Sequence, residues 1–142
     1  MDVDSIAVHR TLTLVGAQRI IDECLASSLG RGVPVCVAVV DVAGHLLAFA
    51  RMDGAPLLSA TLAQDKAYTV TAFGGLPTHA WFGLIKDDPA LLHGIVKTER
   101  LIVFGGGVPV RVGGALVGAV GVSGGTAEQD RAIAEAGSAL FS

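Results

Sequence analysis

The feature that most constrains the fold of this chain is a glycine-rich run near its C-terminal end. Nine of the twenty-two residues 104–125 are glycine, in the sequence FGGGVPVRVGGALVGAVGVSGG. Glycine adopts positive φ angles and lets a second backbone or a ligand approach closely. The alternation around Arg111, followed by Gly113–Gly114 and a second apolar run, predicts a β-hairpin. We therefore expect strands over 108–112 and 115–122.

The triple glycine Gly105–Gly107 leaves two interpretations open. A phosphate-binding P-loop is excluded because no GK[ST] follows the glycines, and Val110 stands where a dinucleotide-binding fingerprint requires glycine. The glycines can be structural, as a turn, a bulge or a close packing contact. Alternatively, their exposed N–H groups also line a site for an anionic group.

Length and composition predict one domain that associates with copies of itself. A chain of 142 residues corresponds to a single domain, residues 1–142. Hydrophobic residues make up 51% and charged residues only 16% of the chain. Because so few polar residues cannot comfortably cover a small monomer, we expect a homo-oligomer. Cys24 and Cys36 lack C-x-x-C spacing, so we expect two buried small residues.

Charge and hydropathy disfavour membrane and nucleic-acid partners. The longest uncharged stretch, 67–85, contains three glycines, a proline and a histidine, which make a poor transmembrane helix. The N-terminal sequence MDVDSIAVHR has no apolar core of the signal-peptide type, so we expect a cytoplasmic protein. The net charge is −3 and no Lys/Arg cluster occurs, so neither nucleic acid nor an anionic membrane is an expected partner.

Periodicity elsewhere predicts helices around an antiparallel sheet. Strands are expected over 35–40, 45–51 and 101–104 in addition to the glycine-rich hairpin. Helices are expected from 14 to about 30, from about 58 to 73, after Pro77, after Pro89 and from 126 to 140. The fold class is therefore α+β, with an antiparallel sheet of about five strands, helices packed on it, and the order α-β-β-α-α-β-β-β-α.

Lys66 is the charged residue that fits its expected surroundings least well. It falls in the middle of the apolar face of the helix expected over 58–73. One interpretation is that its methylenes pack while the ammonium reaches water or a carboxylate such as Asp53 or Asp41. The other is a cation at a cleft, which binds an anionic ligand or acts as a base once burial lowers its pKa.

Arg51 and Asp53 follow the second expected strand, where loops often carry ligand-binding residues. Arg51 can hold a carboxylate through two parallel hydrogen bonds, and Asp53 can neutralise it. A turn aspartate beside a solvated arginine is the alternative.

The histidines predict no closed metal site. None of the four stands at ligand spacing from another, at His9, His45, His79 and His93. His79 begins an expected helix beside Trp81, and it is a candidate acid/base or axial haem ligand, or simply a surface residue.

Three segments together resemble the GlcG/HbpS family, which includes the C-terminal domain of PduO-type proteins. They are VAVVDVAGHLLAFARMDGAPLLS at 37–59, AQDKAYTVTAF at 63–73, and FGGGVPVRVGGALVGAVGVSGGTAEQD at 104–130. The resemblance implies a profilin-like or PAS-like domain that assembles as dimers to octamers. It also implies binding of haem in some members, with links to haem degradation or iron. The positions that match the family motifs are Asp41, Arg51, Met52, Asp53, Gly54, Lys66, Gly105–Gly107, Pro109, Ser123, Gly124 and Asp130.

Three functions follow as hypotheses. In the first, the protein binds haem or a similar flat acidic ligand, with Lys66 and Arg51 on the propionates and an axial ligand at His79, Thr78 or His9. The aromatic wall would come from Phe73, Trp81 and Phe104.

The second hypothesis is a lyase or isomerase that needs no cofactor and acts on a small carboxylate. Arg51 would clamp the substrate, the amides of Gly105–Gly107 would stabilise an oxyanion, and Lys66 or Asp53 would move the proton. The third hypothesis is a purely structural role in assembly.

Overall fold

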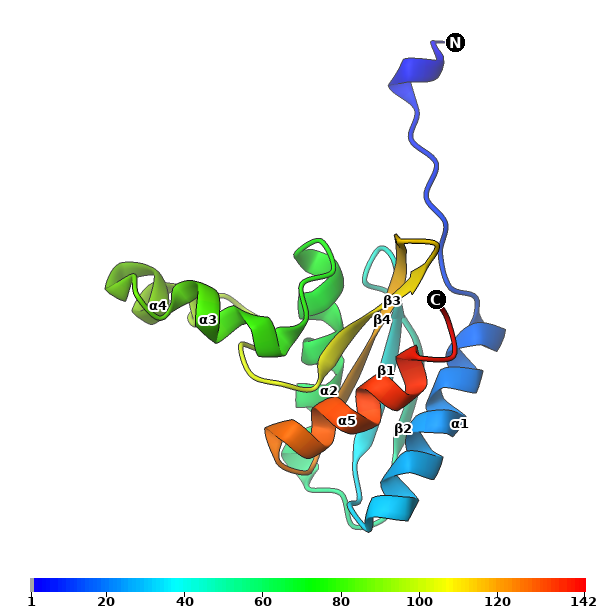
Figure 1. The fold of residues 1–142 in the computed structure, drawn as a ribbon, viewed down its shortest axis with the longest axis vertical. Helices are drawn as coiled ribbons and strands as arrows, with labels where there is room; N and C mark the ends of the chain where they lie inside the picture. The colour runs from blue at the N-terminus through cyan, green and yellow to red at the C-terminus, as the bar shows by residue number, and fades with distance from the viewer. Residues whose placement is uncertain (1) are drawn as a thin grey trace.

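Two hairpins build the sheet of the computed structural model, which describes residues 2–142 (Figure 1). Strands β1 (Cys36–Asp41) and β2 (Leu46–Arg51) form the first hairpin, and β3 (Gly107–Val112) and β4 (Ala115–Ser123) form the second. Because β1 also pairs antiparallel with β4, the strand order is β2-β1-β4-β3. The glycine-rich hairpin is thus confirmed, and the class is α+β.

Helices cover both faces of this sheet (Figure 1). Helices α1 (Leu14–Arg31) and α5 (Ala127–Ser138) pack on one face, and α2 (Leu57–Ala72) packs on the other. The Thr13 hydroxyl accepts a hydrogen bond from the Gly16 amide and so caps α1. Thr126 and Gln129 form a reciprocal capping box at the start of α5.

Strand β1 lies at the centre of the core. Its side chains alternate between a cluster beneath α1 and α5, which contains Val37 and Val39, and a cluster beneath α2, which contains Cys36 and Ala38. Residues 35–40 show no polar alternation, a pattern that predicts a strand covered on both faces, and the two clusters confirm this prediction. Cys24 and Cys36 are both free and buried, as expected.

The expected fifth strand is wrong, since the sheet has four strands. Residues 101–103 have no regular secondary structure and Phe104 lies in a bend. The Ile102 amide donates to the Thr69 hydroxyl of α2 at 3.0 Å, so this segment is bonded to a helix side chain and not to a strand. Four apolar residues suit a short strand or a segment that packs on a helix, and the Thr69 contact decides between them.

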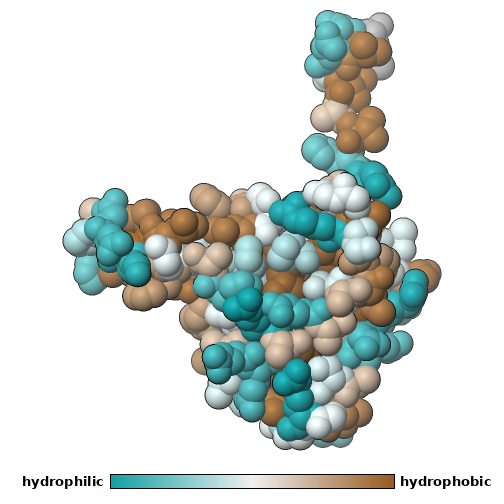
Figure 2. Space-filling model, viewed as in Figure 1, coloured by the Kyte–Doolittle hydropathy of each residue, from teal (hydrophilic) through white to brown (hydrophobic). Residues whose placement is uncertain are grey.

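Two parts of the chain project from the body (Figure 1). One is an arm that carries the 3-10 turn η2 (Thr78–Ala80) and helices α3 (Trp81–Ile85) and α4 (Pro89–Ile95). The other is the N-terminal segment, which includes η1 (Val3–Ser5). Figure 2 shows apolar surface on both. None of the helices in the described residues combines the length and hydropathy needed to cross a membrane.

The close packing of α2 on the sheet depends on Gly121. A Cβ atom at this position would collide with the Ala63 carbonyl oxygen and would lie 2.7 Å from the Ala67 amide nitrogen. We expect Gly121→Ala to reduce the free energy of unfolding by about 1–3 kcal/mol, because the backbone of α2 must shift. Urea denaturation measures this loss.

The matched control is Gly30→Ala, which lies in α1 with no atom near the added methyl group. It should leave stability unchanged or raise it by about 0.5–1 kcal/mol, through the helix preference of alanine. An equal effect of both substitutions would contradict the packing role of Gly121.

Candidate functional site

Lys66 forms a buried ion pair with Asp130 in the interior of the molecule. Its side chain extends from α2 past the ends of β3 and β4, and Nζ donates to the Val122 carbonyl at 2.9 Å and to Asp130 Oδ2 at 3.1 Å. The two side chains are 1% and 3% exposed. The other Asp130 oxygen accepts the Gly125 amide at 2.9 Å. Of the two interpretations, pairing with a carboxylate is realised, and the partner is neither Asp53 nor Asp41.

The triple glycine provides the space through which the Lys66 side chain passes. A Cβ atom at Gly106, whose φ is 131°, would lie 2.7 Å from Lys66 Nζ and 2.9 Å from Cδ. A Cβ atom at Gly107 would lie 2.6 Å from the Lys66 carbonyl oxygen. These contacts leave no room for a side chain, so close packing alone accounts for Gly106 and Gly107.

Phe104 covers the ammonium group on its remaining side. Lys66 Nζ lies 5.1 Å from the centroid of the ring, which is within the range of a cation–π contact. Burial lowers the pKa of Lys66 from its ordinary value, and the adjacent Asp130 carboxylate opposes this shift. The ammonium is therefore saturated by two oxygens and an aromatic face, whereas Phe104 itself is half-exposed.

Thr78 fixes the backbone of the glycine run. Its hydroxyl accepts a hydrogen bond from the Gly107 amide at 2.8 Å, and the side chain is fully buried. One of the three amides considered as oxyanion donors is thus already bonded within the protein.

His79 and Trp81 each carry a buried ring nitrogen without a partner among the described residues, His79 Nδ1 and Trp81 Nε1. Burial and the charge of Arg131 lower the pKa of His79, and Glu135 opposes them. The imidazole is therefore neutral near pH 7, the form that binds metals. The Trp81 ring is buried and lies 4.7 Å from the ring of the exposed Phe73.

Arg51 and Asp53 lie apart from this cluster. Arg51 ends β2, an edge strand, and β1 and β4 separate it from the strand that begins at Gly107. Both residues line a groove beside α1, together with Leu25 and Leu29. The structure thus brings together Lys66, Thr78, His79, Trp81, Phe104 and Gly105–Gly107, and it does not bring Arg51 or Asp53 to them.

A larger hollow, of about 640 Å³, lies at the opposite end of the sheet. That volume is typical of small-molecule sites, which span roughly 300–1,000 Å³. Its walls come from the N-terminal segment, the β1–β2 turn, the end of α2 and the β3–β4 hairpin, through Val8, His9, Arg10, Val42, Ala43, Thr71, Ala115 and Leu116. The hollow therefore offers one imidazole, one guanidinium and mostly apolar walls.

Thr11 anchors the N-terminal segment beside this hollow. Its hydroxyl accepts the Val42 amide at 3.0 Å, and the next amide, that of Leu12, donates to the Val117 carbonyl at 2.9 Å. Sequence reasoning considered His9 but missed Arg10. No local pattern could have found Arg10, because four separate chain segments form the walls.

The described residues contain no cluster of three His, Cys, Asp or Glu side chains able to hold a metal ion by themselves.

Comparison with known proteins identifies the family. Residues 12–139 match the family described as haem degrading protein HbpS-like. The chain therefore belongs to the HbpS-like family, which confirms the resemblance seen in the sequence motifs.

Individual relatives cover most of the chain. A 15.0 kDa protein encoded between dhaT and dhaS in Citrobacter freundii is 40% identical over 93% of each chain. The crystal structure of ORFY from Klebsiella pneumoniae has a TM-score of 0.89 at 33% identity, over 99% of this chain and 96% of that one. The crystal structure of a PduOC–haem complex has a TM-score of 0.83 at 31% identity, over 92% and 95% of the two chains.

A double-mutant cycle tests the coupling between Lys66 and Asp130. We expect Lys66→Met alone to cost about 3–5 kcal/mol, because it leaves a buried carboxylate without its counter-ion. The double variant Lys66→Met/Asp130→Asn should cost less than the sum of the single changes, with a coupling of about 1–3 kcal/mol. Urea denaturation of the four proteins provides these values.

The exposed pair Arg131–Glu135, whose Nε and Oε1 atoms lie 2.7 Å apart, is the matched control. Its side chains are both 48% exposed, so its coupling should be only about 0.3–0.5 kcal/mol. If the losses in free energy of unfolding caused by the two single substitutions simply add in the double variant, Lys66 and Asp130 are not coupled, and this would contradict the account of the buried pair.

Proposed function

We propose that this protein binds haem, or a similar flat acidic ligand, in the hollow lined by His9 and Arg10. Membership of the HbpS-like family and the similarity to a PduOC–haem complex support haem as the ligand. The observation that carries the choice of site is the combination of an exposed imidazole, a neighbouring guanidinium and apolar walls in one hollow of about 640 Å³.

Each wall of the hollow matches one part of haem. The apolar side chains of Val8, Val42 and Leu116 suit the porphyrin faces. The Arg10 guanidinium can hold a propionate through charge-assisted hydrogen bonds. His9 is exposed, so its ring is free to act as an axial ligand of the iron.

His79 is the second candidate for the axial position. Its imidazole is neutral near pH 7, and Phe104 exposes part of its ring beside the same glycine run, so a flat ligand could stack there. However, Nδ1 is buried, and the Cβ of His79 packs close to Gly105. His79 therefore has less freedom than His9 to turn toward an iron atom.

Haem titration followed by the Soret absorbance tests the proposal. Changes in residues that only orient a metal ligand already cost about 10–100-fold in affinity, so loss of the ligand itself in His9→Ala should weaken haem binding at least about tenfold. Arg10→Gln should weaken binding less and leave the position of the Soret band unchanged, because the propionate is not bound to iron.

His79→Ala is the matched control, and it should bind haem as the unaltered protein does. A Soret shift lost in His79→Ala and kept in His9→Ala would move the site to the glycine run. A haem spectrum unchanged by the protein would overturn haem binding altogether. Loss of the Soret band on addition of a reductant in air would extend the proposal to haem degradation.

We also propose that copies of this chain associate. Supporting this, large apolar side chains are exposed on the arm and at the start of α2, among them Phe82 at 56%, Leu84 at 67% and Leu57 at 88%. Their burial between copies would agree with the high hydrophobic content of the sequence.

Light scattering measures the assembly. The expected mass is a multiple of 14.4 kDa, and the double variant Phe82→Glu/Leu84→Glu should shift it toward the monomer. Lys86→Glu, which changes charge on the same arm without changing its apolar surface, should leave the mass unchanged. A monomer for the unaltered chain would contradict the proposal.

A further inference from the structure

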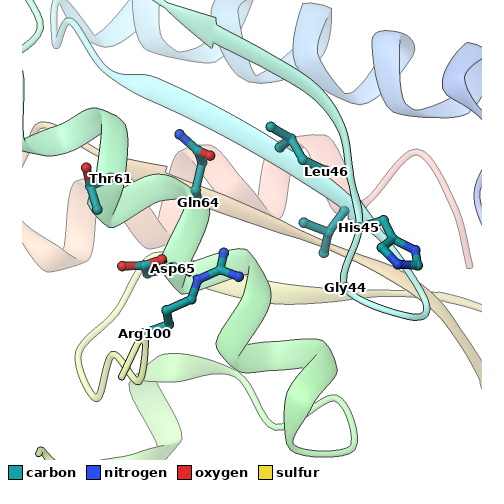
Figure 3. Close-up of a pocket in the computed structure, with 8 residues that line it drawn as sticks. Gly44, His45, Leu46, Thr61, Gln64, Asp65 and Arg100 are labelled. Atoms are coloured by element: carbon teal, nitrogen blue, oxygen red, sulfur yellow. Dashed lines mark hydrogen bonds and ion pairs between the residues drawn. The ribbon is translucent and has the colours of Figure 1, made fainter. Parts of the chain in front are cut away.

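A second hollow, of about 530 Å³, lies between α2 and the β1–β2 hairpin. It shares no lining residue with the proposed haem site or with the glycine run. Thr61, Gln64 and Asp65 border it from α2, and Leu46 borders it from β2 (Figure 3). Arg100 completes the lining from the loop that follows α4. Its lining is more polar than that of the hollow beside His9.

Two side chains of α2 fix the Arg100 guanidinium. Asp65 Oδ1 accepts a hydrogen bond from Arg100 Nε at 2.9 Å. The guanidinium carbon stands 3.9 Å from the centroid of the Tyr68 ring, close enough for stacking. Asp65 and Tyr68 are three residues apart on one helix, so they hold the arginine from the same surface.

A third residue of this helix fixes the Arg100 backbone. The buried Thr69 hydroxyl lies 2.9 Å from the Arg100 carbonyl oxygen and accepts the Ile102 amide at 3.0 Å. Arg100 itself has φ of 65°, the sole positive φ of a non-glycine residue within 2–142. A strained residue held by several contacts is a common feature of ligand sites.

The contacts leave the terminal nitrogens of Arg100 available. Its side chain is 46% exposed, and within the described chain neither terminal nitrogen donates a hydrogen bond to the protein. A guanidinium held at Nε and presented end-on matches the two oxygens of a carboxylate. Because the arginine is already positioned, binding would cost little side-chain entropy.

The remaining lining restricts which carboxylate fits. Asp65 places a negative charge beside the arginine, so a second anionic group on the ligand would be repelled. His45 also lines the hollow, and its Nδ1 atom lies 3.4 Å from Asp41 Oδ2. Gln64 Nε2 donates to the Ala60 carbonyl, which leaves its side-chain oxygen as an acceptor toward a ligand hydroxyl.

We propose that the hollow between α2 and β2 is a binding site for a small monocarboxylate that bears a hydroxyl or carbonyl group. Arg100 holds the carboxylate end-on. Thr61 and Gln64 contact the neutral polar group, and Val40 and Leu46 contact the carbon skeleton.

Amide NMR titration of the haem-free protein with lactate tests this site. Lactate should shift the amides of residues 44–46, 61–65 and 100, whereas the neutral analogue lactamide should not. Arg100→Gly keeps the positive φ without strain and removes the guanidinium, so the fold should persist and lactate should bind at least about tenfold more weakly. Arg100→Lys keeps the positive charge but loses the two parallel N–H donors of the guanidinium, so it should bind lactate as weakly as Arg100→Gly does.

Arg111→Lys, an exposed arginine on β3, is the matched control and should bind lactate as the unaltered protein does. Malonate, with two carboxylates, should bind more weakly than lactate because of Asp65. No amide shift with lactate, shifts confined to other residues, or unchanged affinity in Arg100→Gly would each overturn the proposal. The test uses neither haem nor His9, so this site and the haem site can fail independently.

Discussion

The structure depends on one buried interaction, the ion pair of Lys66 with Asp130 beyond the ends of β3 and β4. A buried ammonium is unfavourable unless oxygens surround it, and here a carboxylate and a backbone carbonyl do so. The contact connects α2 on one face of the sheet with α5 on the other. The glycine run is the consequence, since Gly106 and Gly107 leave the space that the lysine side chain fills.

This arrangement separates the two ends of the sheet by role. At the end where β3 begins, the amide of Gly107 and the oxygens of Asp130 are already bonded within the protein. At the end where the hairpins turn, and along the open side of β2, the hollows remain, and each presents an arginine. We therefore propose that the hollows bind ligands, and we attribute the glycines of the family motif to the close packing of the fold.

Much of the fold could be predicted from the sequence, because local patterns encode it. The unbroken apolar run of β1, the caps of α1 and α5 and the Gly113–Gly114 turn each act within a few residues. Long-range contacts could not be predicted in this way. The sequence pattern marks Lys66 as unusual, but its partner Asp130 lies 64 residues away. Residues 101–104 have a strand-like pattern, but the hydrogen bond from the Ile102 amide to Thr69 holds this segment against α2. The sequence around Arg100 does not mark it as a site residue, because the contacts that hold its side chain come from Asp65 and Tyr68 of α2.

Native-state hydrogen exchange at the amides of Gly107, Val122 and Gly125 tests the central claim most directly. These amides donate to Thr78, Gly106 and Asp130 respectively. If the glycine run is a closely packed part of the core, these amides should exchange only through global unfolding, with the same free energy of opening as the core amides of β1. Exchange as fast as that of exposed turns, slowed by added haem, would show instead that the run is an open ligand loop.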